Sequence, residues 1–375
     1  MIIGLPPSKF PRDVFDFLVF LPAFLSLDRN RIVLLWSSPV LRVIGLILVY
    51  AGLTHLWGPP DEGLFDWRHL RSMVMIFGFV AMAAWLTARD ERFLDILFLS
   101  AGWAAAIMAA VSIWLFATGA GASSAGRLIG WAWPDPNSSA AVVAVILLGL
   151  LDRISRFARI SLLAAGIAAP VPLLLVFMAL TEARAAAAGL FLGVAVLALA
   201  ITRRRGISWK ISSSVGGLLV AILATAAPRW ELTSLLSTSA GYFYLWDHYF
   251  NLAMQKPWLG HGILALEAVT MPGGQVLTNA HNKIIDAFFY GGGIAVALLA
   301  ALIVIAGQFA VRTLYRRGDG LPGALLAFCT IYTFGIPAVL PLFSSMAWWW
   351  IHCWLPLAII AGVQIRDLLN ERRAA

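Results

Sequence analysis

The chain has 375 residues, of which 61% are hydrophobic and 12% are charged. A soluble globular domain has about 25% charged residues, so the composition excludes a soluble domain and indicates that the bilayer is the solvent. The formal net charge of +8 does not indicate nucleic-acid binding, because Lys and Arg stand in short clusters between apolar runs. Cys329 and Cys353 both lie in apolar runs, and their spacing supports neither a disulfide framework nor a zinc site.

Apolar runs follow one another through most of the sequence, and a membrane-crossing helix needs about 20 such residues. The expected segments are 14–27, 32–53, 70–86, 93–116, 138–151, 161–180, 185–201, 211–227, 284–310, 321–342 and 346–363. This pattern predicts an all-α polytopic membrane protein with about 10–12 transmembrane helices. The segments 14–27 and 138–151 are short for a full span. We expect the first to be re-entrant or interfacial, with the N-terminus inside.

Short connections rich in Arg alternate with longer connections rich in Trp, Gly and Pro. The Arg-rich ones are 28–31, 89–92, 152–159, 203–210, 312–317 and the tail from 366, and we expect them in the cytoplasm. The others, which would face the opposite side, are 55–69, 118–137, 181–184, 228–283 and 343–345. The long connection divides the chain into an N-terminal transmembrane bundle (1–227), an outer loop domain (228–283) and C-terminal transmembrane helices (284–375).

The long outer connection contains the pattern of an amphipathic helix. Apolar residues at helical spacing are Tyr242, Leu245, Trp246, Tyr249, Leu252 and Ala253, and the opposite line is Asp247, Asn251 and Gln255. The helix would end near Lys256 and Pro257, before the turn-like Gly260-His261-Gly262. We expect it to lie on the membrane surface. It would either contact substrate or only cover the bundle.

Thr181, Glu182 and Arg184 interrupt what would otherwise be one long apolar run. An arginine at mid-span costs about 2.5–3.5 kcal/mol on insertion scales, so such a residue generally lines a cavity or pairs with an opposite charge. Arg184 is therefore a candidate for binding an anion. The alternative is a local turn whose charges are solvated at the outer interface.

The span after the long connection opens with polar side chains. Asn282 and Asp286 are four residues apart and share a helix face, with Lys283 between them and His281 just before. A neutral histidine has a pKa near working pH and is a candidate general base. The alternative is that this His-Asn pair caps the helix.

A third group precedes the segment 138–151. Residues 134–137, Pro-Asp-Pro-Asn, are typical of a turn and predict Asn137 as a helix N-cap. Arg127 lies upstream, where it would meet a phosphate or remain solvated.

Several of these elements occur in the order found in a known family. They are Thr-Glu-Ala-Arg at 181–184, Lys-Pro-Trp-Leu-Gly-His-Gly at 256–262, and the segment 280–299, which begins Ala-His-Asn-Lys. Together with Asp-Pro-Asn at 135–137, they resemble the O-antigen ligase and polymerase (Wzy_C) superfamily. The resemblance covers residues 126–299, and the flanks match only in hydropathy.

The resemblance implies a GT-C-type bundle with one large periplasmic loop domain in a bacterial inner membrane. It implies a glycosyltransferase that moves a glycan from undecaprenyl diphosphate to an acceptor hydroxyl on the periplasmic face, with inversion and without a metal or other cofactor. Ligases use lipid A-core as the acceptor, and polymerases use another lipid-linked glycan. The expected partners are these donors and acceptors together with membrane lipids. A ligase is the first interpretation and a polymerase the second.

Carried over by position, Arg184 would hold the diphosphate and His281 would activate the acceptor hydroxyl. An arginine fork suits a diphosphate because it donates bidentate, charge-assisted hydrogen bonds. The family usually has a second arginine after a glycine at the start of the amphipathic helix, whereas Tyr242 follows Gly241 here. Cations that would replace it from the same side are Arg127, Arg229, Lys256 and Lys283. Asn137, Asn282 and Asp286 complete the expected substrate-binding set.

Two other functions remain open. In a transporter or flippase, Arg184 and Asp286 would be pathway charges and His281 a proton relay. Inverted repeats would favour this interpretation, and inspection finds none in this sequence. A non-catalytic subunit of a polysaccharide assembly system would explain the missing arginine at Tyr242.

Overall fold

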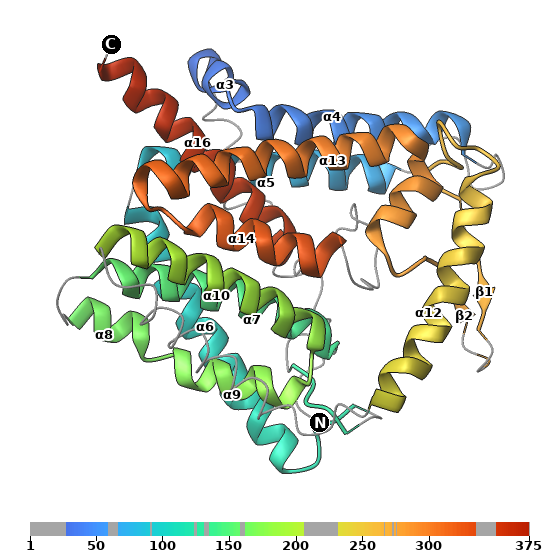
Figure 1. Ribbon diagram of the computed structural model, residues 1–375, viewed down its shortest axis with the longest axis horizontal. Coiled ribbons are helices and arrows are strands. Elements are labelled where there is room, and N and C mark those ends of the chain that lie inside the picture. The colour runs from blue at the N-terminus through green and yellow to red at the C-terminus, as the bar shows by residue number, and fades with distance from the viewer. Residues whose placement is uncertain are drawn as a thin grey trace.

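The computed structural model describes residues 28–58, 67–90, 92–123, 126–130, 135–157, 162–205, 232–265, 267–271, 274, 276–334 and 350–374. Within this part of the chain, eight helices are long and apolar enough to cross a membrane, and a shorter apolar helix covers Leu321–Tyr332. Figure 1 shows these helices packed in one bundle, with α12 (Leu232–Ala253) standing beside it. The prediction of an all-α polytopic membrane protein is confirmed. The expected segments 14–27 and 211–227 lie outside the described residues.

The helices follow the predicted apolar runs closely. Their bounds are α3 (Arg29–Trp36), α4 (Pro39–Leu53), η2 (Thr54–Trp57), α5 (Trp67–Arg89), α6 (Arg92–Ala117), α7 (Pro136–Arg156), α8 (Leu162–Ala168), α9 (Val171–Thr181), α10 (Arg184–Arg205), α13 (Lys283–Arg317), α14 (Leu321–Cys329), η4 (Thr330–Phe334), η5 (Trp350–Trp354) and α16 (Leu355–Ala374). Two short strands, β1 (Val269–Thr270) and β2 (Val276–Leu277), pair antiparallel beside α12.

Two predicted spans differ from the observed helices: a serine and a proline divide one, and the other is longer than predicted. The expected segment 32–53 is two helices, because the Ser38 hydroxyl accepts the Leu41 N–H and Pro39 starts α4. The segment 138–151 is short in the sequence, whereas the helix α7 that contains it has 21 residues, and Asp135 caps its start. The prediction of Asn137 as the N-cap is wrong: Asp135 accepts the N–H groups of Asn137 and Ser138.

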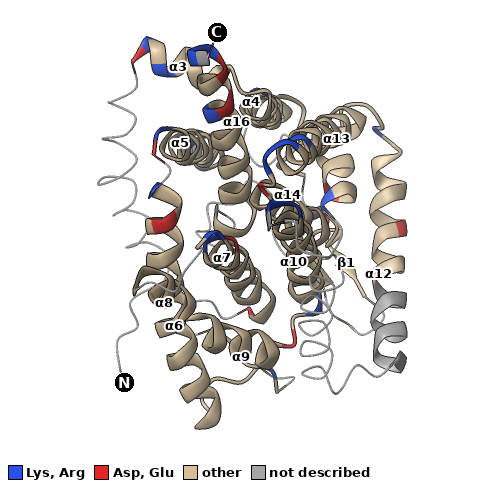
Figure 2. Ribbon diagram, turned by 60° about the vertical axis from the view of Figure 1, so that its left-hand side comes forward, with Lys and Arg blue, Asp and Glu red and all other residues tan. Residues whose placement is uncertain are grey.

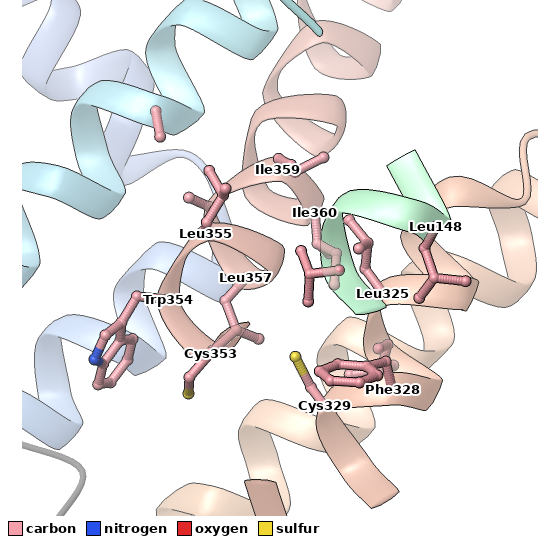
Figure 3. Close-up of a cluster of buried hydrophobic side chains, with 14 of the residues drawn as sticks. Leu148, Leu325, Phe328, Cys329, Cys353, Trp354, Leu355, Leu357, Ile359 and Ile360 are labelled. Carbon is pink, nitrogen blue, oxygen red and sulfur yellow. The ribbon is translucent and has the colours of Figure 1, made fainter. Parts of the chain in front are cut away.

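The core of the bundle surrounds α7. Every residue from 140 to 148 is at most 5% exposed, because α6, α9, α10 and α14 pack around this helix. Both cysteines, which the sequence places in apolar runs, are buried. Figure 3 shows them among apolar side chains of α14, η5 and α16, next to Phe328 and Leu357. Burial of apolar side chains against neighbouring helices fixes the packing of the membrane part.

The Arg-rich connections meet at one end of the bundle. Asp152, fully buried at the end of α7, forms ion pairs with Arg153 and Arg156, and the Arg204 guanidinium lies 3.6 Å away. Arg156 also contacts Asp319 at 2.6 Å. Figure 2 shows Lys and Arg segments at the ends of α3, α5, α7 and α16 that come forward in this view. Several elements that the sequence predicted on one side of the membrane therefore lie together.

Candidate functional site

The predicted amphipathic helix exists as α12. Leu245, Tyr249 and Ala253 are spaced four residues apart and are fully buried, in a cluster that includes Phe289 of α13. The Tyr249 hydroxyl donates to the Glu267 carbonyl at 2.7 Å, which ties the helix to the segment before β1. The predicted polar line, Asp247, Asn251 and Gln255, is exposed. This apolar stripe holds α12 against the start of α13.

The turn after α12 packs against a kink in α13. The backbone of Gly292 has φ 63°, and the helix bends there. Three backbone hydrogen bonds join turn and kink: His261 N–H donates to the Phe289 carbonyl at 2.8 Å, Gly262 N–H to Tyr290 at 2.9 Å, and Gly293 N–H to Pro257 at 2.7 Å. The turn therefore satisfies peptide groups that the kink leaves without a helical partner.

Glycine is required on both sides of this contact. A Cβ at Gly260 would lie 2.5 Å from the Tyr290 backbone, and one at Gly292 would lie 2.3 Å from the Trp258 backbone. Both residues also have positive φ, which glycine adopts without strain. The Pro-x-x-Gly-x-Gly turn and the consecutive glycines 291–293 of α13 thus fix the position of the α13 N-terminus.

His261 belongs to this scaffold. Its ring stacks on Phe289 with centroids 4.9 Å apart, and its Nε2 lies 2.8 Å from the Leu252 carbonyl. Both contacts hold the end of α12 against α13.

His281 lies just before the stabilised start of α13, in a left-handed backbone conformation with φ 52°. Its N–H donates to the Asn279 side-chain oxygen at 3.0 Å. The residue is 8% exposed, and its ring centroid lies 6.0 Å from that of Tyr242. Burial lowers the pKa of His281, with Lys283 acting in the same direction and Asp286 opposing. The imidazole is therefore neutral at pH 7 and is able to accept a proton.

A buried ion pair fixes the turn that carries His281. Lys283 Nζ lies 3.0 Å from Asp286 Oδ2, and both side chains are at most 6% exposed. The other carboxylate oxygen of Asp286 accepts the Ala280 N–H at 2.8 Å. Asp286 thus joins the residue before His281 to the first turn of α13. The structure places Asp286 and Lys283 against each other inside the protein.

Asn282 is the N-cap of α13. Its side-chain oxygen accepts the N–H groups of Ile284 and Ile285, at 3.0 and 3.3 Å. The capping role that the sequence offered as an alternative is thus present for Asn282. His281 is not the N-cap; it precedes Asn282 in a left-handed backbone conformation.

Arg184 is the first residue of α10, directly after a break between two apolar helices. Glu182 ends α9 in a left-handed conformation, with φ 50° and ψ 31°. This reverses the chain direction and sets Arg184 at a helix start, half-buried. A local turn is thus present, and the binding of an anion by Arg184 stays a prediction.

Arg127 forms hydrogen bonds at the break between α9 and α10. Its Nε donates to the Thr181 carbonyl at 2.8 Å, and its guanidinium donates to the Asn137 side-chain oxygen at 2.9 Å. Burial lowers the pKa of Arg127, opposed by Glu182 and by Asp135 and aided by Arg184. Arg127 therefore lies close enough to Glu182, Asp135 and Arg184 for their charges to act on it. Sequence reasoning singled out Arg127, Asn137 and Arg184 separately but had no signal that would join them.

The structure thus gathers the predicted residues into two groups, one around Arg184 and one around His281. The first joins the loop 126–130 to the start of α7 and to the end of α9, just before Arg184, and the second joins α12 to the start of α13. In Figure 1 the starts of α7, α10 and α13 all lie toward the side of the bundle where α12 stands. Arg229 lies outside the described residues. Sequence reasoning missed the place of Tyr242 beside His281.

A comparison with known families matches residues 169–300 to the Wzy_C model, described as O-Antigen ligase. This match confirms the resemblance for that part of the chain and supports membership of the O-antigen ligase and polymerase superfamily. The matched residues contain α9, α10, α12 and the kinked start of α13, and therefore both Arg184 and His281. No curated protein matches the chain.

Proposed function

We propose that this protein is a glycosyltransferase of the inner membrane that moves a glycan from undecaprenyl diphosphate to an acceptor hydroxyl on the periplasmic face. The family match suggests a ligase- or polymerase-type transfer. The observation that carries the proposal is the buried His281 beside Tyr242 in the family-matched segment. The Arg184 start of α10 lies in the same segment and offers the charge that a diphosphate needs.

In this reaction the acceptor oxygen forms a bond to the anomeric carbon while that carbon's bond to the diphosphate oxygen breaks. His281 takes the proton of the acceptor hydroxyl, and undecaprenyl diphosphate leaves with the bonding electron pair. A base aimed at the attacking oxygen contributes about 10² to 10⁴ in rate. Attack opposite to the leaving group inverts the anomeric carbon.

Charge develops on the diphosphate as it leaves, and Arg184 would meet it with bidentate hydrogen bonds. Tyr242 stands where the family usually has a second arginine, next to the proposed base. Burial raises the pKa of Tyr242, so its phenol keeps its proton at pH 7 and acts as a neutral donor. We assign Tyr242 to a diphosphate oxygen, and Arg127 to holding the Arg184 turn in place.

Asp286 and Lys283 act as positioning residues in this scheme. Their buried ion pair and the hydrogen bond to Ala280 hold the left-handed turn at His281. Asn282 caps the helix behind it. These three residues would act on the reaction by positioning His281, without contacting the substrate themselves.

The acceptor decides between ligase and polymerase. We take the ligase type, with lipid A-core as the acceptor, as the first assignment and a polymerase of O-antigen or exopolysaccharide as the second. Both place the reacting groups on the periplasmic side, opposite the Arg-rich end of the bundle.

The test is complementation of a ligase-deficient strain and, separately, of a polymerase-deficient strain. Surface polysaccharide is resolved on a gel for the wild type and for His281→Asn, with membrane levels of each protein measured. Glycan attached to lipid A-core, lost in the variant, supports ligation; restored chain length instead supports polymerisation. Restoration by the variant as well would overturn the role of His281.

A further inference from the structure

The helices α3 and α5 line two successive spaces, an apolar groove and a basic cavity. On α5, Met73, Phe77 and Ala81 line the groove, and Trp85 and Arg89, nearer the last turn, line the cavity. Residues of α3 also line both spaces. The two spaces therefore follow one another along the same two helices.

The apolar groove runs between α4 and α5. It has a volume of about 690 Å³. Leu48 and Gly52 of α4 and Met73 and Phe77 of α5 line it, together with Trp36 of α3. Apart from His55, its lining carries no ionisable side chain. In a bilayer this groove has the chemistry of an acyl-chain site.

The basic cavity lies between α3, α5 and α16 and has a volume of about 620 Å³. Four arginines line it, Arg31, Arg89, Arg366 and Arg373, with Asp28 as the one acidic residue of the lining. Asp28 caps α3 and lies 3.4 Å from the Arg31 guanidinium, so its charge is directed to one arginine. The lining keeps a positive excess.

The basic cavity and the His281 group lie at opposite ends of α4. Tyr50, near the end of α4, donates to the Gly291 carbonyl at 2.7 Å, and the Thr54 hydroxyl accepts the Ile263 N–H at 3.2 Å. The arginine cavity begins instead at Asp28, before the start of α4. A ligand in it would be separate from the proposed glycan-transfer site.

We propose that these two spaces form one binding site for an anionic lipid, with the phosphate headgroup among the four arginines and an acyl chain along the groove. Guanidinium groups bind phosphate through paired, charge-assisted hydrogen bonds. Anionic lipids concentrate at the cytoplasmic surface, where basic clusters attract them. A free phosphate shares the headgroup chemistry but leaves the groove without an occupant. The succession of an apolar groove and a basic cavity along α3 and α5 favours the lipid.

Native mass spectrometry of the full-length protein in detergent tests this site, with dioleoyl phosphatidylglycerol and dioleoyl phosphatidylcholine as probes. The double variant Arg89→Gln/Arg373→Gln changes two exposed arginines of the cavity. The matched control, Arg312→Gln/Arg316→Gln, changes two exposed arginines near the end of α13. We expect about ten-fold weaker phosphatidylglycerol binding in the first variant and wild-type binding in the control. Equal loss in both, or equal binding of the two lipids by the wild type, would overturn the proposal.

A groove variant separates the lipid from a free anion. A Cβ at Gly52 meets only the Met73 sulfur, at 3.7 Å, so Gly52→Leu places a side chain in the groove without a backbone clash. We expect Gly52→Leu to lower phosphatidylglycerol binding several-fold while thermal unfolding in detergent and binding of inorganic phosphate stay as in the wild type. Unchanged lipid binding in Gly52→Leu, together with loss in the arginine variant, would show a soluble-anion site and reject the lipid as occupant.

Discussion

The rings of Tyr242 and His281 lie with their centroids 6.0 Å apart and their planes inclined by 39°. Tyr242 comes from α12 and His281 from the turn before α13, so this contact depends on the docking of the whole α12 segment. It places a neutral hydroxyl beside the proposed base at the position where the resemblance predicts an arginine. A phenol supplies one hydrogen bond, whereas a guanidinium would also supply charge.

Removal of the Tyr242 hydroxyl tests its role toward the diphosphate. A hydrogen bond to a charged group contributes about 1.5–3 kcal/mol, so we expect Tyr242→Phe to slow glycan transfer by about 10-fold or more. Tyr242→Arg should retain transfer, because it restores the family's donor. Tyr244→Phe, on the exposed part of the same helix, serves as the control. Wild-type rates in Tyr242→Phe would remove the hydroxyl from the mechanism.

The left-handed backbone at His281 allows the role of its imidazole in transfer to be separated from its contribution to stability. Asparagine tolerates positive φ but is no base, so His281→Asn should keep the thermal stability of the wild type and lose about 10² or more in rate. His281→Ala should lose the same rate and additional stability, because alanine adopts this conformation with strain. Rates and unfolding temperatures of the two variants give the comparison. A fully active His281→Asn would contradict the base assignment.

The pH dependence follows from the direction of the His281 pKa. The neutral form is the active base, and burial lowers the pKa below the usual value of about 6.5. Transfer should therefore be constant from pH 7 to 8 and fall only below about pH 6.5, as the imidazole becomes protonated. Asp286→Asn should move this acidic limb to lower pH, because the carboxylate favours the protonated ring, and Lys283→Met should move it to higher pH. Identical profiles in all three proteins would argue against His281 as the titrating group.

Breaking the buried ion pair should cost stability, and removing both charges should restore most of it. Asp286→Asn leaves the Lys283 ammonium buried without its carboxylate, a loss of about 3–5 kcal/mol. In Lys283→Met/Asp286→Asn the charge is gone and the asparagine oxygen still accepts the Ala280 N–H. The free energy of unfolding in detergent is measured for the single and the double variant, with the exposed Asp247→Asn as the control. A double variant as unstable as the single one would show that the pair does not act through its charges.

Arg127 and Arg184 should respond differently to the same substitution. Arg127→Gln loses two hydrogen bonds that hold the α9–α10 break and should lower the free energy of unfolding by about 1–3 kcal/mol. Arg184→Gln should cost less stability but lower transfer by about 100-fold, because the leaving diphosphate loses its charged donor. Comparing unfolding and transfer in membranes separates the two roles. The reverse pattern would make Arg127 the diphosphate ligand.

Hydropathy predicted most of the described helices to within a few residues, because the bilayer leaves the backbone little choice other than helix. The stripe Leu245, Tyr249 and Ala253 likewise predicted α12. Periodicity does not show how a helix starts, so Asn137 was assigned the cap that Asp135 provides. Two serines before Pro39 gave too weak a signal to divide the segment 32–53.

The candidate site was harder to derive from the sequence because its parts meet only through tertiary contacts. Arg184 and His281 stood out as polar residues in apolar surroundings. Nothing local indicated that Arg127 holds the carbonyl of Thr181, or that Tyr242 faces His281. Both relationships join segments far apart along the chain, and they arise from the kinked α13 and the break after α9.

The most direct measurement is glycan transfer by purified protein in liposomes that contain an undecaprenyl diphosphate-linked glycan and an acceptor. The account predicts that the wild type releases undecaprenyl diphosphate and glycosylates the acceptor in equal amounts. It also predicts that His281→Asn, with wild-type unfolding, is slower by about 10² or more. Glycosylation at the wild-type rate by His281→Asn, or movement of intact lipid-linked glycan between leaflets without release of the diphosphate, would contradict it.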